Sequence, residues 1–151
     1  MAVQKEGGAT FNYAIQSLLF KPSPKPATEH GDVIASAAVE RFKVEILAPY
    51  TLQDFVAEYG RRGRGSPYVK VHLRDGTPVV FNPRDVAAAL QAPMKTMALH
   101  IYKFLTEVAI RLPKKRLTNV YLTGGLWNMK CMREPMEALG WTLMCASFSL
   151  I

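Results

Sequence analysis

The last third of the chain has a pattern of hydrophobic and polar residues typical of a β-α-β unit. Apolar runs at 118–123 and 141–148 predict two strands, and residues 132–139 between them predict a short helix. Gly124 and Gly125 form a turn after the first strand. Strands of this kind need a covering layer, so the unit predicts a helix packed against it.

The segment 94–112 supplies that helix. Its apolar residues recur every three or four positions, with polar residues on the opposite side. Pro93 suits the first turn of such a helix, and Pro113 ends it. A separate short helical turn is expected before it, at 86–90.

The middle of the chain predicts a β-hairpin and one further strand. Alternating residues at 68–73 and 77–81 flank Asp75 and Gly76, and Asp-Gly between alternating runs is a strong hairpin signal. The alternation of apolar and charged residues at 41–47 predicts a half-buried strand.

A short helix is expected at 51–59, with Thr51 as its N-cap and Gly60 as its end. Residues 1–31 combine a short apolar segment with a proline-rich spacer, which predicts an extended N-terminal arm reaching across a neighbour. The fold class is therefore α/β: residues 32–151 form a single domain with a mixed sheet, in which the hairpin is followed by α-β-α-β.

Charge narrows the choice of partner. The chain has 151 residues and a net charge of +7, and its bases concentrate in two acid-poor stretches. Such clustering favours a polyanion, although a generic basic surface is the alternative. The first stretch includes Gly60–Pro67, where glycines would let the backbone approach phosphates that arginines bind. The candidate RNA-contacting residues are Arg61, Arg62, Arg64, Lys70, Arg74, Lys114, Lys115, Arg116, Lys130 and Arg133.

No motif in the sequence indicates catalysis. The glycine turn at 124–125 lacks the lysine of a phosphate-binding loop, and no nucleophile is paired with an orienting base. Cys131 and Cys145 have no companions at metal-ligand spacing. We therefore expect a non-enzymatic protein without cofactor or metal. No apolar run reaches the length of a membrane span, so no span is expected.

The order of the predicted elements in residues 68–150 resembles the family of the small-subunit platform ribosomal protein eleven. The matching pieces are Leu73–Gly76, Ala92-Pro93 with its helix, Asn119–Leu122, Gly124-Gly125, Arg133-Glu134 and Ala138–Gly140. The resemblance implies a divergent mitochondrial member of this family. Such a protein would be a structural constituent of the ribosome in the mitochondrial matrix, bound to ribosomal RNA and neighbouring ribosomal proteins, with the cytoplasm as an alternative location.

Residues 41–112 also resemble a thioredoxin-like module shared by some mitochondrial ribosomal proteins and a respiratory complex I accessory subunit. The redox Cys-x-x-Cys motif of thioredoxins is absent, so this resemblance implies a scaffold. The alternative function is thus an accessory subunit of a respiratory complex at the mitochondrial inner membrane, held by protein–protein contacts.

Overall fold

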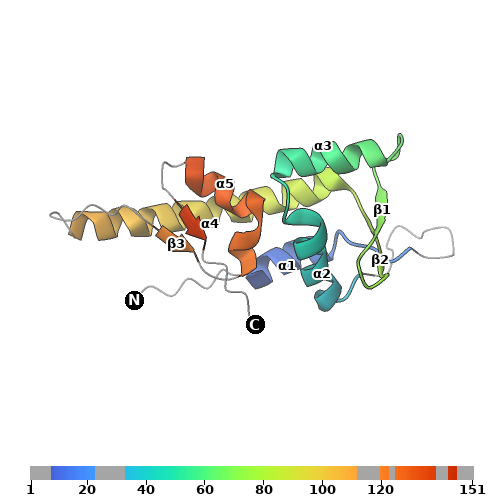
Figure 1. The fold of residues 1–151 in the computed structure, drawn as a ribbon, viewed down its shortest axis with the longest axis horizontal. Helices are drawn as coiled ribbons and strands as arrows, with labels where there is room; N and C mark the ends of the chain where they lie inside the picture. Colours follow the sequence, from blue (N-terminus) through green and yellow to red (C-terminus); the bar gives the residue numbers. More distant parts are fainter. Residues whose placement is uncertain (1–7, 23–32, 112–119, 123–124, 139–142, 146–151) are drawn as a thin grey trace.

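A computed structural model describes residues 8–22, 33–111, 120–122, 125–138 and 143–145, and shows a helix-rich fold that also contains strands (Figure 1). Its elements, in chain order, are α1 (Gly8–Gln16), α2 (Ser36–Phe42), the π-helix η1 (Lys43–Leu47), α3 (Leu52–Arg62), β1 (Val69–His72), β2 (Pro78–Phe81), α4 (Pro83–Arg111), β3 (Val120–Leu122), the 3₁₀-helix η2 (Gly125–Asn128), α5 (Lys130–Ala138) and β4 (Leu143–Cys145).

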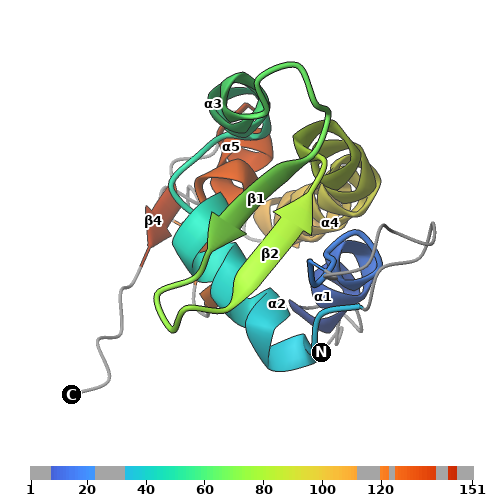
Figure 2. The ribbon, with the colours of Figure 1, turned by 90° about the vertical axis from the view of Figure 1, so that its right-hand side faces the viewer.

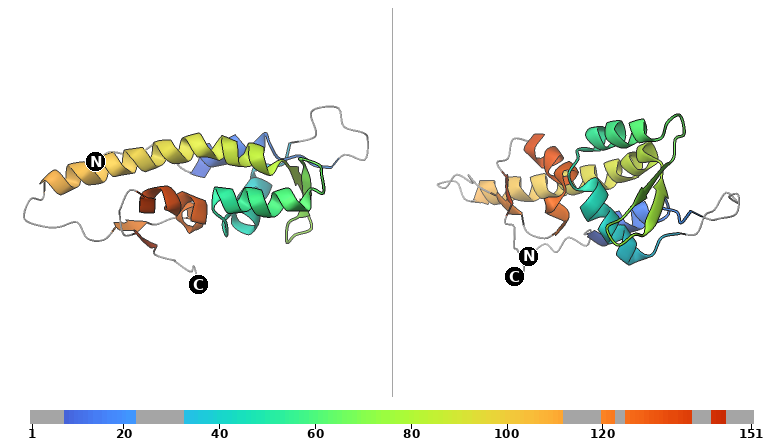
Figure 3. Two further views of the ribbon diagram at one scale, coloured as in Figure 1. Left: turned by 90° about the horizontal axis from the view of Figure 1, so that it is seen from above. Right: turned by 45° about the vertical axis from the view of Figure 1, so that its right-hand side comes forward.

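Helix α4 runs along the long axis of the molecule (Figure 1), and α1, α3 and α5 pack against it. Helices α3 and α5 follow one another along its length (Figure 3). The prediction of two helices separated before Pro93 is wrong, because α4 runs through this proline without interruption. Leu90 and Met94 on either side of it are buried, and this packing outweighs the local cost of an interior proline.

The hairpin prediction is confirmed. Strands β1 and β2 pair antiparallel, with Val69 opposite Phe81 and His72 opposite Pro78. In the turn, the backbone N–H of Thr77 donates to Asp75 Oδ1 over 3.0 Å. Gly76 has φ +83°, a conformation that glycine adopts without strain.

The strand predicted at 41–47 is wrong, because this segment is the end of α2 followed by η1. Val39, Phe42 and Ile46 are buried together. Their spacing also fits one face of a helix, so the short alternating run was compatible with both periods.

Helix α3 confirms the predicted helix and its cap, since the N–H of Asp54 donates to Thr51 Oγ1 over 3.1 Å. Its predicted end at Gly60 is wrong. The helix continues to Arg62, and Arg62 pairs with Glu58 one turn earlier. Such i,i+4 pairs stabilise a helix, and this one helps the helix to continue past Gly60.

The C-terminal β-α-β prediction is confirmed for its described residues, in which β3 and β4 pair in parallel and η2 and α5 lie between them in the chain. The predicted mixed sheet is wrong for the described part of the chain. There the hairpin and the parallel pair form two separate two-stranded sheets.

Four aromatic rings join α2, α3 and the hairpin. The Phe81 ring lies 5.0 Å from Phe42, 5.8 Å from Phe55 and 5.5 Å from Tyr59, measured between ring centroids. Phe42, Phe55 and Phe81 are fully buried. Edge-on and offset ring pairs of this kind contribute about 0.5–1.5 kcal/mol each beyond burial.

The described part of the predicted N-terminal arm belongs to the domain core. Phe11, Ile15 and Leu19 are at most 1% exposed, and α1 packs against both α2 and α4. The prediction that this segment lies outside the core is therefore wrong for residues 8–22. The prolines that suggested an arm follow α1 in the sequence and do not interrupt it.

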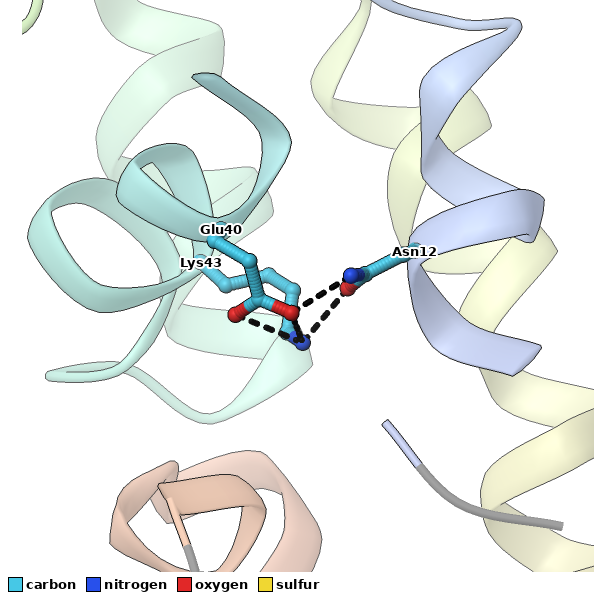
Figure 4. Close-up of polar contacts among 3 residues, drawn as sticks. All are labelled: Asn12, Glu40 and Lys43. Carbon is cyan, nitrogen blue, oxygen red and sulfur yellow. Dashed lines mark hydrogen bonds and ion pairs between the residues drawn. The ribbon is translucent and has the colours of Figure 1, made fainter. Parts of the chain in front are cut away.

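A polar triad connects α1 to the start of η1 (Figure 4). The ammonium of Lys43, which is buried, donates to Asn12 Oδ1 over 2.6 Å and to Glu40 Oε1 over 3.2 Å. Asn12 Nδ2 in turn donates to Glu40. Lys43 is the only buried charged residue among those the structure describes, and these acceptors compensate its desolvation.

Replacement of two aromatic residues of α1 tests whether this helix is core. Phe11→Ala should lower the free energy of unfolding by about 3–5 kcal/mol, because it removes a buried ring. Tyr13→Ala is the matched control, since Tyr13 is 83% exposed, and should change it by less than about 0.5 kcal/mol. Urea denaturation measures both. Equal effects would show that α1 does not pack as described.

The triad predicts an acid-sensitive contribution to stability. The hydrogen bond from the Asn12 amide lowers the pKa of Glu40 from its ordinary 4.5 more than partial burial raises it, and the nearby Lys43 ammonium lowers it further. A lowered carboxyl pKa stabilises the folded state above about pH 4.5, and this stability is lost as pH falls through the folded-state pKa. Wild type should exceed Glu40→Gln in unfolding free energy at pH 6, and the gap should close toward pH 3. A gap independent of pH would contradict this.

Candidate nucleic-acid interface

Basic residues gather at the end of the molecule formed by the hairpin. The last turn of α3, its connection to β1, the hairpin itself and the start of α4 all lie at this end (Figure 2). Of the predicted residues, this end holds Arg61, Arg62, Arg64, Lys70 and Arg74. We call this set of elements the hairpin end.

Arg61 and Arg62 lie on the last turn of α3, beyond the helix end that was predicted at Gly60. Both guanidinium groups donate hydrogen bonds to the Glu58 carboxylate. The bond from Arg62 to Glu58 Oε1 is 2.8 Å long. These hydrogen bonds, first from Arg62 and then from Arg61, lower the pKa of Glu58. The Arg62 guanidinium also lies 4.7 Å from the centroid of the Tyr59 ring. The two arginines are therefore held in position, and one carboxylate balances only half of their charge.

Arg64 projects from a tight turn. The N–H of Ser66 donates to the carbonyl of Gly63 over 2.9 Å. Gly63 has no room for a side chain, since a Cβ there would lie 2.2 Å from the Ser66 carbonyl oxygen. Arg64 itself has φ +46°, and Gly65 has φ +93°. A non-glycine residue in this region is strained, and such strain is concentrated at functional sites.

Lys70 and Arg74 continue this basic surface along the hairpin. Lys70 is exposed on β1, as is His72 two residues later. The backbone N–H of Arg74 donates to Glu45 over 2.8 Å, which fixes the turn while its side chain remains exposed. Neither the Lys70 nor the Arg74 side chain pairs with an acid among the described residues.

Most acids near this surface already form ion pairs or hydrogen bonds within the protein. Asp75 pairs with Arg41 over 2.7 Å. The N–H of Thr77, and to a lesser extent Arg41, lower the pKa of Asp75. With Glu58 held by its two arginines, Asp85 in the first turn of α4 is the exposed carboxylate at this end without an ion pair to a described residue.

Two further predicted residues, Lys130 and Arg133, do not join this surface. Lys130 and Arg133 lie on α5, beyond α3 from the hairpin along the axis of α4 (Figures 1 and 3). Lys130 is exposed, whereas Arg133 is half-buried and makes contacts within the protein. The predicted cluster Lys114, Lys115 and Arg116 lies outside the described residues.

Sequence reasoning missed Arg84, which is exposed at the start of α4. The N–H of this residue donates to Asn82 Oδ1 over 3.1 Å, so Asn82 caps the helix. Arg84 is isolated in the sequence, and only the fold places it beside the hairpin. The signal available was the short connection from the predicted hairpin into the following helix.

Other kinds of site find no support in the described residues. No group of three or more His, Cys, Asp or Glu side chains there could hold a metal ion. Burial raises the pKa of the Cys131 thiol to about 11, so this thiol is protonated and a poor nucleophile at neutral pH. None of the described helices is both long enough and apolar enough to cross a bilayer.

Comparison with known proteins assigns this chain to no family. No protein-family model, curated protein or solved structure matches this chain.

The pairing of Glu58 with two arginines predicts that this acid weakens polyanion binding. Glu58→Gln should elute from a heparin column at higher salt than wild type, because it frees both guanidinium groups. Asp54→Asn on the same helix removes the same charge without freeing a base, and should shift elution less. Equal shifts in the two variants would show that only net charge matters.

Proposed function

We propose that this protein is a non-catalytic structural subunit of a mitochondrial ribosome, which binds ribosomal RNA through the hairpin end. The observation that carries this proposal is the row of exposed bases without acidic partners, Arg64, Lys70 and Arg74, next to acids that are already engaged. Such a surface presents positive charge that only an external anion can balance.

The geometry suits binding that positions the protein without reading sequence. Arginine and lysine contacts to phosphate fix orientation on RNA and do not depend on the bases. The basic residues of the hairpin end lie on a capped helix, a tight turn and a hairpin. The backbone at these positions is already ordered, so it loses little conformational freedom on binding. A structural subunit requires this kind of contact.

The order of elements supports the link to the platform ribosomal protein eleven family. Hairpin, long helix, strand, short helix and strand follow one another here as the resemblance implies. We propose a divergent member of that family, in which the hairpin has separated from the parallel strands and α4 joins the two parts.

A second candidate function is an accessory scaffold subunit of a respiratory complex, held by protein contacts. The observation that favours it lies in the second half of α4, where four large apolar side chains are 40–72% exposed: Leu99, Tyr102, Phe104 and Ile110. Exposed apolar patches of this kind often mark protein interfaces.

Charge reversal tests the RNA-binding surface. The double variant Lys70→Glu/Arg74→Glu should weaken binding to ribosomal RNA fragments and reduce the slope of log affinity against log salt by roughly 0.7–0.9 for each lost phosphate contact. The matched control Lys95→Glu/Lys103→Glu makes the same charge change on exposed positions of α4 and should retain most of the binding. Fluorescence anisotropy at several salt concentrations measures both. An equal loss in the two variants would contradict a localised site.

Sedimentation of mitochondrial extracts distinguishes the two candidate functions. A ribosomal subunit should co-migrate with ribosomal particles, and RNase should release it. Co-migration with detergent-solubilised respiratory complexes, unaffected by RNase, would support the scaffold function instead.

A further inference from the structure

The outward face of the hairpin carries an aromatic ring in line with its bases. Along β1 and the residue before it, Tyr68, Lys70 and His72 are exposed, whereas Val69 between them is buried. Side chains two apart on a strand share a face. Tyr68, which is 49% exposed, therefore lies in one row with Lys70 and His72.

The same face extends beyond β2 to the residues after α1. Lys70 lies opposite Val80, and Phe20 pairs with Val80 from the other side through two backbone hydrogen bonds of 3.0 Å. Directly opposite residues share a face of the sheet. Phe20 is thus on the face of Lys70, while Val79 and Phe81 turn to the core. We call this surface, with Tyr68, Lys70, His72, Val80 and Phe20, the outer hairpin face.

Figure 2 shows where this surface lies. The hairpin is at the end of the molecule, in front of the helices. The tight turn with Arg64 precedes the row of β1, and Arg74 follows it, so bases lie at both ends of the row. The two-residue repeat of a strand spaces the side chains by about 6.6 Å, comparable to the separation of successive phosphates in an extended nucleic-acid strand.

We infer that the outer hairpin face binds an unpaired stretch of RNA, with a base stacked on Tyr68 and phosphates contacted by Arg64, Lys70 and Arg74. This inference rests on the proposed function, which supplies the polymer. Aromatic rings among bases suit a single strand, because its bases expose their faces and can stack. In a duplex the base faces are covered, so Tyr68 would contribute nothing to binding there.

The experiment compares one unstructured RNA 12-mer, fluorescently labelled, with the same strand annealed to its complement. Wild type should bind the single strand more tightly. Tyr68→Ala should weaken single-strand binding about five- to a hundred-fold and leave duplex binding unchanged. Tyr68→Phe keeps the ring and should retain binding. Tyr102→Ala is the matched control, an exposed tyrosine on α4 (40%), and should have no effect. Circular dichroism checks that each variant is folded.

The outcomes separate this inference from the proposed function. Binding to both RNAs that falls on charge reversal at Lys70 and Arg74 but is unchanged by Tyr68→Ala would overturn the single-strand inference and leave RNA binding standing. Binding of neither RNA would overturn both. Equally tight binding of a polyglutamate peptide, with the same dependence on Tyr68, would overturn the assignment of RNA as the partner.

Discussion

The contact of Phe81 with three other rings is the constraint on which the position of the hairpin end depends. Phe81 belongs to β2, Phe42 to α2, and Phe55 and Tyr59 to α3. A two-stranded hairpin alone is marginal in water. Because this ring is fully buried, the inward face of the hairpin is fixed to the helices, and its other face must point outward.

In this arrangement the two faces of the hairpin have different roles: one packs in the core and the other presents charge. The inward residues of the hairpin belong to the core, while the outward residues are basic, aromatic or half-buried. Three acids close to this surface are satisfied within the protein: Glu58 by two arginines, Asp75 by Arg41, and Glu45 by the backbone of Arg74. The positive charge that remains is therefore a property of the fold as well as of composition.

Local signals predicted the parts of this structure that local chemistry decides. The Asp75-Gly76 turn specified the hairpin, and Thr51 specified the start of α3. Prediction failed where tertiary packing decides. The run at 41–47 fits two periods, and burial of Phe42 and Ile46 selects the helix. The same holds for Pro93, which would end a helix by itself but lies inside α4.

In the candidate site, too, some features follow from local sequence and others from tertiary packing. The arginines after Gly60 were identifiable as a cluster, but their pairing with Glu58 depends on the helix continuing past that glycine. Neither Arg84 nor Phe20 could be assigned to this surface from sequence. Their positions follow from the start of α4 and from a single bridge to Val80, a pairing between segments sixty residues apart.

The turn between α3 and β1 also has an evolutionary consequence. At Gly63 any side chain would meet the Ser66 carbonyl, and at Gly65 the backbone angle disfavours every other residue. These two glycines are thus constrained by geometry alone, whatever the chain binds. Divergent relatives should retain this glycine pair even where the surrounding charges have drifted, which makes it a more durable marker of common ancestry than the arginines.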